Sequence, residues 1–369
     1  MDSAVEAGRI VGCSVVVARD GQIVHERLAG WADRQSGTPV TAEHRFRLAS
    51  MTKPVVVAAA LALADRGDLD LRAPVHTVLP WFRPSLPDGA MPDVTLYHLL
   101  SHTAGLSYGF LHDENDDPHR AAGVSDGGDY TGVSLRENLE RLARVPLQFP
   151  PGDGWCYSLG IDVAGAVIET VTGEPLPAAV ARLVTDPLGM RDTGFSAAAD
   201  RLVTAYADAA KPGRPARPMA AEDRVQFPGA GPIRLAPGRA ADPAAYPSGG
   251  FGMVGTAGDY LAFLEAVRRC GAPILSPHAV RLMTRDAVPG RDLPVGPGTG
   301  FGLGFAVVRD GAFAGTPRPA GSFGWGGFYG TTCFVDPEAG WSVVALTNTA
   351  LEGIFGAFPG EIETAVYGS

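Results

Sequence analysis

The segment Phe46-Arg-Leu-Ala-Ser-Met-Thr-Lys53 places a serine and a lysine three residues apart, directly before the apolar run 54–64. Residues i and i+3 lie on one face of a helical turn, so the Lys53 amine can reach the Ser50 hydroxyl. A serine becomes a nucleophile beside a base, and a helix N-terminus favours negative charge near the Ser50 amide. Pro54 supports a helix start here, although it disfavours the α conformation at Lys53. By itself this pattern more often marks a capping serine followed by a surface lysine.

Strand patterns lie at both ends of the chain, and helical patterns lie between them. Near the N-terminus, two β-branched stretches flank Asp20-Gly21, a dipeptide typical of a hairpin turn. We therefore expect an α+β fold in which both chain ends build one antiparallel sheet flanked by helices, beside a helical lobe. The predicted strand segments are 10–19, 22–31, 300–308, 331–335 and 341–346. The predicted helices are 55–66, 95–101, 135–144, 161–172, 176–184 and 259–269.

The length of 369 residues predicts more than one lobe, because a single core stops growing at roughly 250–300 residues. We expect an α/β domain from residues 1–75 and 250–369, and a mainly helical domain from 76–249. Segments 107–134 and 205–250 have few periodic apolar positions and many Gly, Pro and Asp residues. They are predicted to be long loops of the kind that shape a binding site.

The charge and residue usage exclude several classes of partner. A formal charge of −10 without a Lys/Arg run argues against nucleic acid. The apolar run 54–64 is too short for a membrane span, which needs about 18 residues. The first residues lack a secretory signal pattern, so we expect a cytoplasmic protein. The four cysteines are far apart and H-E-x-x-H does not occur, so we expect no metal and no cofactor.

Further motifs follow the Ser50/Lys53 pair in a fixed order, and together they resemble the serine β-lactamase and penicillin-binding-protein superfamily, class C-like. The resemblance implies a β-lactamase/transpeptidase-like fold and an acyl-enzyme on Ser50. It also implies that Tyr157 and Lys53 share the proton of Ser50 as general base and acid. The resemblance spans residues 10–348 and rests on 46–53, Leu99-Leu-Ser-His-Thr-Ala-Gly-Leu106, Tyr157-Ser158-Leu159, Asp186-Pro-Leu-Gly-Met-Arg-Asp-Thr-Gly-Phe195 and Gly321-Ser-Phe-Gly-Trp-Gly-Gly-Phe328.

Two departures from the class C pattern redirect the expected substrate. Leu159 stands where those enzymes have Asn, and Trp325-Gly326-Gly327 stands where they have Lys-Thr-Gly. The missing lysine removes a cation for a β-lactam or peptide carboxylate, and the missing Asn removes an amide for an acylamino group. Leu159, Trp325, Gly326 and Gly327 are therefore expected to line a site for neutral acyl or alcohol groups.

The pattern Tyr-Ser-x with Trp-x-Gly resembles the family VIII carboxylesterases and related acyltransferases most closely. That resemblance implies an oxyanion hole made by the backbone N–H groups of Ser50 and Phe328. We expect ester hydrolysis of a small acyl substrate, with acyl transfer as the main alternative. A β-lactamase, D-peptidase or amidase, and a non-catalytic binding module, remain further alternatives. The sequence does not indicate an oligomeric state.

Three other motifs have more ordinary interpretations. Residues 250–255 match G-x-G-x-x-G, but no strand precedes them, so we expect a turn into a helix capped by Thr256. His98 and His102 have zinc-ligand spacing without the glutamate of a zinc helix, and packing at a helix end is the better interpretation. Cys156-Tyr-Ser-Leu-Gly160 lacks the first glycine of an α/β-hydrolase elbow.

Overall fold

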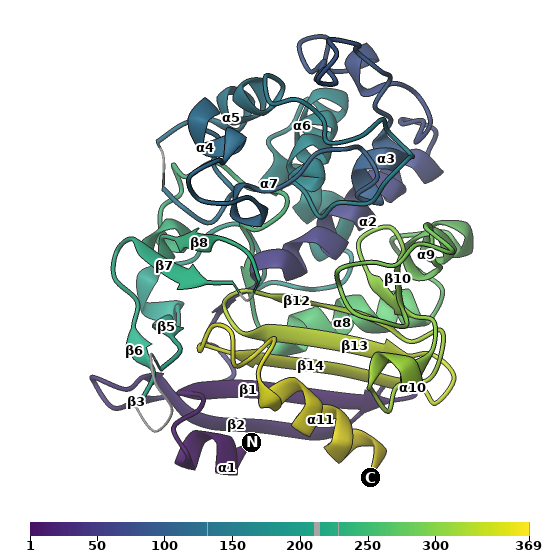
Figure 1. Ribbon diagram of the computed structural model, residues 1–369. Coiled ribbons are helices and arrows are strands. Elements are labelled where there is room, and N and C mark those ends of the chain that lie inside the picture. Colours follow the sequence, from purple (N-terminus) through teal and green to yellow (C-terminus); the bar gives the residue numbers. More distant parts are fainter. Residues whose placement is uncertain (131, 210–214, 228, 369) are drawn as a thin grey trace.

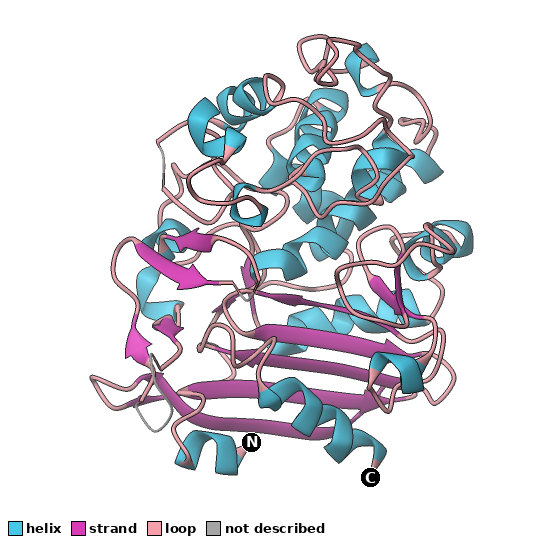
Figure 2. Ribbon diagram, viewed as in Figure 1, coloured by secondary structure: helices cyan, strands magenta, loops and turns pink. Residues whose placement is uncertain are grey.

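The computed structural model describes residues 1–130, 132–209, 215–227 and 229–368, and its largest feature is an eight-stranded antiparallel sheet (Figures 1 and 2). In register, Cys13 faces Thr347 and Arg19 faces Trp341, so the two ends of the chain meet inside the sheet. The expected sheet built from both chain ends is confirmed. In spatial order the strands are β10 (Thr299–Phe301), β11 (Ala306–Val308), β12 (Phe323–Gly327), β13 (Thr331–Asp336), β14 (Trp341–Thr347), β1 (Gly12–Arg19), β2 (Gln22–Asp33) and β3 (Thr38–Pro39).

Helices cover both faces of the central strands. Alternate residues of a strand point to opposite faces, and Val16 joins the main core while Val15 and Val17 join a smaller core on the other face. Both faces of β1 are therefore buried, which explains its nearly continuous apolar sequence. The covering helices are α8 (Ala257–Arg268) on the main-core face, and α1 (Asp2–Glu6) with α11 (Ala357–Tyr367) on the other.

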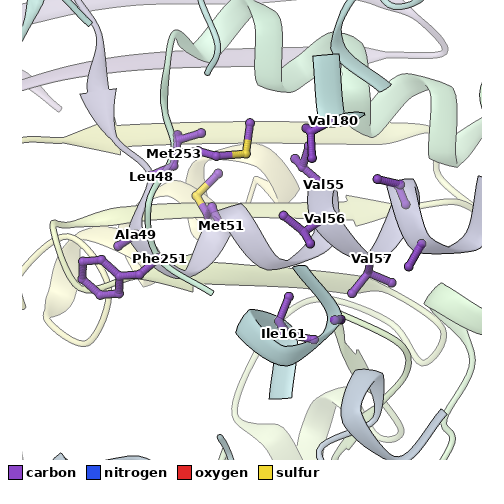
Figure 3. Packing of buried hydrophobic residues seen from close by; sticks show 14 of the residues in the cluster. Leu48, Ala49, Met51, Val55, Val56, Val57, Ile161, Val180, Phe251 and Met253 are labelled. Carbon is purple, nitrogen blue, oxygen red and sulfur yellow. The ribbon is translucent and has the colours of Figure 1, made fainter. Parts of the chain in front are cut away.

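Helix α2 (Thr52–Asp65) links the sheet to the helical part of the molecule (Figure 1). It is buried on all sides from Thr52 to Leu63, as expected for a helix without a polar face. Figure 3 shows Val55, Val56 and Val57 of α2 among apolar side chains of other segments. The remaining helices are α3 (Leu96–Leu100), α4 (Pro118–Ala122), α5 (Leu135–Leu142), α6 (Gly160–Thr172), α7 (Leu176–Val180), α9 (Pro277–Thr284) and α10 (Gly311–Ala314).

The structure corrects parts of the predicted secondary structure. The stretch 300–308 forms two strands, because Gly302 and Phe305 close a turn in which Gly304 has φ +93°. Helix α7 continues into a wider turn at Ala181–Thr185. Helices α1, α4, α9, α10 and α11 were not predicted. The first, second and fourth of these have at most five residues, which is too short for a periodic pattern to be recognised.

The two predicted loops contain short elements. Segment 107–134 includes α4, and segment 205–250 contains two small hairpins; residues 131, 210–214 and 228 lie outside the described residues. No helix in the described part of the chain is long and apolar enough to cross a membrane. The division into two domains remains a proposal. The short strands are β5 (Tyr206–Ala207), β6 (Arg217–Pro218), β7 (Asp223–Gln226), β8 (Pro232–Leu235), and the pair β4 (Phe46–Arg47) and β9 (Val254–Gly255).

Candidate active site

Ser50 lies in a 3₁₀ turn, Ala49–Met51, between β4 and α2. Hydrogen bonds fix both ends of this turn. On one side, Leu48 donates its N–H to Met253 O at 2.9 Å. On the other, the Tyr260 hydroxyl donates to Met51 O at 2.9 Å. The turn and the start of α2 leave N–H groups of the first residues without helical acceptors, as at any helix N-terminus.

Ala49 has a φ of +46°, the left-handed region that favours glycine. This conformation costs an alanine roughly 1–2 kcal/mol. It persists because the surrounding core holds the turn: Ala49 is completely buried, and Thr331 Oγ1 donates to Leu48 O at 3.1 Å. Such strain is commonly found at functional sites. Here it sets the direction in which the chain presents Ser50.

Lys53 is completely buried one turn after Ser50, and its amino group lies near two oxygen atoms and the rings of Tyr157 and Tyr108. Its Nζ lies 3.2 Å from Ser50 Oγ and donates to Gly250 O at 2.7 Å. Nζ also lies 4.6 Å from the ring centroid of Tyr157. Gly250 belongs to the glycine-rich stretch 250–255, which enters the site as a backbone acceptor and leads to α8, capped by Thr256 as expected.

Burial lowers the pKa of Lys53 from 10.5 to about 7, and the negative charge of Asp162 opposes that shift. Asp162 is itself fully buried, and burial raises its pKa, although a hydrogen bond from Ser248 Oγ at 2.6 Å and the charge of Lys53 act against the rise. A Cβ on Gly250 would lie 2.6 Å from Asp162 Oδ2 and 3.4 Å from Lys53 Nζ. Glycine is therefore required for these groups to approach each other.

Tyr157 is the second side chain that contacts the Ser50 hydroxyl. Its hydroxyl donates to Ser50 Oγ at 2.8 Å. Burial raises the pKa of Tyr157 above its usual range, and the hydrogen bond with Ser50 offsets part of this effect. The ring packs 4.8 Å from His102 and 5.5 Å from Trp325, measured between centroids. The phenol is thus a fixed, protonated donor near neutral pH.

His102, expected at a helix end, is buried just after α3 with a φ of +58°. Its Nδ1 lies 3.1 Å from Ser158 Oγ, and burial lowers its pKa well below the usual value. His98 instead caps α3, where it exchanges hydrogen bonds with Thr95. The two histidines therefore make separate contacts, one with Thr95 and one with Ser158. In the described residues no group of three His, Cys, Asp or Glu side chains is placed to hold a metal ion.

Strand β12 brings the third motif against the Ser50 turn. A Cβ on Gly327 would lie 2.2 Å from Leu48 O and 3.0 Å from Ala49 Cβ, so the strand can approach only without a side chain. Phe328 follows directly, and its ring packs against Phe110 with 5.4 Å between centroids. At Gly326 a Cβ would meet the end of the Ile354 side chain at 2.7 Å and Thr331 O at 3.0 Å, so its shortest contact is with a side chain rather than with the backbone.

Trp325 lies beside Tyr157 as part of an aromatic group, 5.1 Å from the Phe301 ring. Leu159 does not lie at this surface. Its side chain has 0% exposure and packs in the main core at the start of α6, so the expectation that it lines the substrate site is corrected. The backbone turn that presents Tyr157 to Ser50 directs Leu159 inward.

Sequence reasoning did not find Asp162, Tyr108 or Ser248. The Tyr108 hydroxyl and Asp162 Oδ2 are both buried without hydrogen-bond partners among the described residues, and both lie next to Gly250. Burial raises the pKa of Tyr108 well above its usual value. No spacing in the sequence joins these residues, although an acidic residue inside an apolar helix, as Asp162 is in α6, was a visible signal.

Comparison with known proteins places this geometry in a family. The Beta-lactamase family model matches residues 1–355. Esterase EstB from Burkholderia gladioli is 48% identical, covering 99% of this chain and 93% of that protein. Monacolin J acid methylbutanoyltransferase from Aspergillus terreus is 27% identical, covering 93% of this chain and 87% of that protein.

A solved structure agrees with these relatives. EstCE1, described as a hydrolase with promiscuous acyltransferase activity, superposes with a TM-score of 0.95 at 44% identity, covering 99% of this chain and 96% of that one. The expected β-lactamase/transpeptidase-like fold is confirmed. The chain therefore belongs to the Beta-lactamase family and is an enzyme of the branch that contains esterases and acyltransferases.

Proposed function

We propose that this enzyme hydrolyses carboxylic esters through an acyl-enzyme on Ser50. One observation carries the proposal: Ser50 Oγ lies 3.2 Å from Lys53 Nζ and 2.8 Å from the Tyr157 hydroxyl. A serine with a base on one side and a proton donor on the other has what nucleophilic acyl transfer requires. The likeness to an esterase over nearly the full length supports the same reaction.

The two pKa shifts indicate different roles for Lys53 and Tyr157. Because the pKa of Lys53 is about 7, a large share of its amine is neutral near neutral pH and can take the Ser50 proton. Tyr157 keeps its proton, since its pKa is raised. In this mechanism Ser50 Oγ attacks the ester carbonyl while Lys53 accepts the proton, and Tyr157 stabilises the attacking oxygen by its hydrogen bond.

The remaining steps close the cycle. The tetrahedral oxyanion is stabilised by the backbone N–H groups of Ser50 and Phe328, which the strand β12 brings to the turn. When the C–O bond breaks, the leaving alcohol takes a proton from the Tyr157 hydroxyl, and the Lys53 ammonium reprotonates Tyr157. Water then attacks the acyl carbon while Lys53 accepts its proton. The bond between Ser50 Oγ and the acyl carbon breaks, Ser50 takes that proton from the Lys53 ammonium, and the carboxylic acid leaves.

The surroundings of Ser50 favour a neutral ester over a β-lactam or a D-peptide. Trp325 takes the place of the lysine that would pair with a substrate carboxylate, and it stands among the rings of Tyr157 and Phe301. An aromatic surface binds apolar groups and offers no compensation for a desolvated carboxylate. Gly326 and Gly327 follow Trp325 in β12, and their backbone is the proposed continuation of this substrate wall.

Acyl transfer is the second candidate. Two of the proteins that this chain resembles carry acyltransferase activity in their names, and the reaction differs only in the acceptor. An alcohol in place of water would attack the acyl-enzyme and be deprotonated by Lys53 in the same way.

A single assay series tests both candidates. The protein is incubated with p-nitrophenyl esters of increasing chain length and with a chromogenic cephalosporin, with and without benzyl alcohol. Release of p-nitrophenol that depends on Ser50, with little cephalosporin turnover, supports ester hydrolysis; benzyl ester formation supports transfer. Ester turnover that survives in Ser50→Ala would contradict the mechanism. A protein without turnover is examined by mass spectrometry for an acyl adduct on Ser50.

A further inference from the structure

A small pocket borders the segment that carries Ser50, on the ladder formed by β4 and β9. Three side chains with hydrogen-bond donors line it: Arg47, Arg239 and Tyr329. Arg47 precedes the nucleophile by three residues. The proposed function uses none of these three side chains.

Arg47 is held in this pocket by neutral groups only. Its Nε donates to Pro237 O at 2.9 Å, and its Nη1 donates to Val203 O at 2.6 Å. A guanidinium has five N–H donors, so these two bonds orient it and leave donors for another partner. Arg47 is half-buried, burial lowers its pKa, and the Tyr329 phenol acts in the opposite direction.

Arg239 is held in a similar way. Its side chain is 9% exposed, and it donates to Asp129 O at 3.2 Å and to Tyr246 O. The guanidinium lies 4.2 Å from the centroid of the Tyr246 ring. Within the part of the chain that the structure describes, neither Arg239 nor Arg47 forms an ion pair with an Asp or Glu side chain.

The pocket itself is cationic. Burial raises the pKa of Tyr329 to about 12, and the charges of Arg47 and Arg239 both act against this rise, so both guanidinium groups influence the same phenol. None of the described residues that line the pocket is acidic. Arginine does not lose its proton in a protein, so two positive charges remain. The charge of Arg239 acts on Asp162 and Asp242, although it forms no ion pair with either. An anion hydrogen-bonded between the two guanidinium groups would add a counter-charge in direct contact.

We propose that this pocket binds a small oxyanion, a carboxylate or a phosphate group, between Arg47 and Arg239. The planar guanidinium is suited to such groups because its parallel N–H donors match two oxygens at once. The Tyr329 hydroxyl adds a third donor. Figure 3 shows Phe251 and Met253, two further residues of the pocket wall, beside Ala49 and Leu48 of the nucleophile segment. The anion can therefore be free in solution or carried by the substrate.

Binding is measured by isothermal titration of inorganic phosphate, and separately of acetate, into the protein at constant ionic strength. We expect saturable binding that weakens at least about tenfold in Arg239→Gln. Arg182→Gln is the matched control, because Arg182 is an exposed arginine paired with Glu174. It removes the same charge and should leave the affinity unchanged. No saturable binding, or equal loss in both variants, would overturn the proposal.

Because Arg239 also supports two backbone carbonyls, Arg239→Gln can fail to fold. Tyr329→Phe then serves as the second variant, since it removes only a hydroxyl from the pocket. It should lower phosphate affinity about threefold or more while keeping the circular dichroism spectrum of the parent. An unchanged affinity in folded Tyr329→Phe and folded Arg47→Lys would equally overturn the proposal.

A kinetic arm distinguishes the two sources of the anion. Phosphate is added during hydrolysis of p-nitrophenyl butyrate, which is neutral, and of mono-p-nitrophenyl glutarate, whose acyl chain ends in a carboxylate. A rise in KM for the glutarate alone supports the proposal with a carboxylate of the substrate as occupant. Unchanged KM values for both esters, together with calorimetric binding, support it with a free anion. The calorimetry needs no turnover, so failure of the ester mechanism would not obscure this result.

Discussion

Lys53 is an amine without contact with water, and this determines how the enzyme should respond to pH. Its pKa is lowered from 10.5 to about 7 by burial, so the neutral base becomes more abundant as pH rises through 7. About a tenth of the amine is neutral at pH 6 and about nine-tenths at pH 8. We therefore expect kcat/KM for a neutral p-nitrophenyl ester to rise across this window and then level off. A profile that still rises steeply above pH 9 would contradict the assignment of Lys53 as base.

The role of Tyr157 can be tested by removing only its hydroxyl oxygen. Tyr157→Phe keeps the ring against His102 and Trp325 but removes the donor to Ser50. We expect kcat to fall about 10²–10⁴-fold, because proton transfer to the leaving alcohol loses its donor. The melting temperature should change little. The drop should be smaller for p-nitrophenyl esters than for alkyl esters, because p-nitrophenolate leaves without a proton; an equal drop would argue against the acid role.

The sequence predicted the residues that act directly on Ser50. It did not predict the residues that influence the pKa values of those groups. Lys53 is three residues from Ser50, and the resemblance supplied Tyr157. Asp162 and Tyr108 reach the same place only through the packing of α6 and of the loop after α3. Electrostatic tuning depends on distance and burial in space, which spacing along one chain does not encode.

Gly326 and Gly327 are neighbours in β12, but a Cβ added at each would meet different atoms. Gly327→Ala would place a Cβ 2.2 Å from Leu48 O, a backbone atom that cannot rotate away. We expect a loss of about 2–3 kcal/mol in the free energy of unfolding, from overpacking against the Ser50 turn. Activity should fall about 10²–10³-fold, because the strand that carries the Phe328 N–H is displaced from the oxyanion.

Gly326→Ala is the control for this pair, since its Cβ meets the movable end of Ile354 first. Its stability loss, measured by urea unfolding in the same way, should stay under about 1.5 kcal/mol. If the two variants lose stability and activity equally, the close contact between β12 and the Ser50 turn is not what positions the site.

The elements that sequence patterns predicted well are those with an unambiguous period or turn. The Asp20-Gly21 hairpin and the all-apolar α2 are examples. Residues 300–308 were predicted as one strand because their apolar residues are continuous, and the reversal at Gly304 depends on a backbone angle rather than on a pattern. Leu159 was misplaced for a related reason: its neighbour Tyr157 faces the site, and the turn into α6 directs Leu159 away from it.

Helix α2 connects the sheet with the helical part of the molecule, and the two ends of the chain pair with each other inside the sheet. Helix α2 packs against α6 and α7 in the helical part and carries at its start the turn that β12 and β13 contact. The sequence predicts two domains, but a helix buried on both sides ties their stabilities together. We therefore expect the loss of structure and the loss of activity to occur in one cooperative transition.

Phe358 offers a test of this cooperativity far from Ser50 in the sequence. It is completely buried where α11 packs on the face of the sheet that carries Val15 and Val17, so Phe358→Ala should cost about 3–5 kcal/mol in unfolding free energy. Phe313→Ala on α10, where the ring is 66% exposed, should change it by less than about 0.5 kcal/mol. Urea titrations followed by circular dichroism and by esterase activity should shift to lower midpoints together in Phe358→Ala. If the circular dichroism midpoint falls while the activity midpoint stays at the parent value, the sheet and the catalytic turn unfold as separate units.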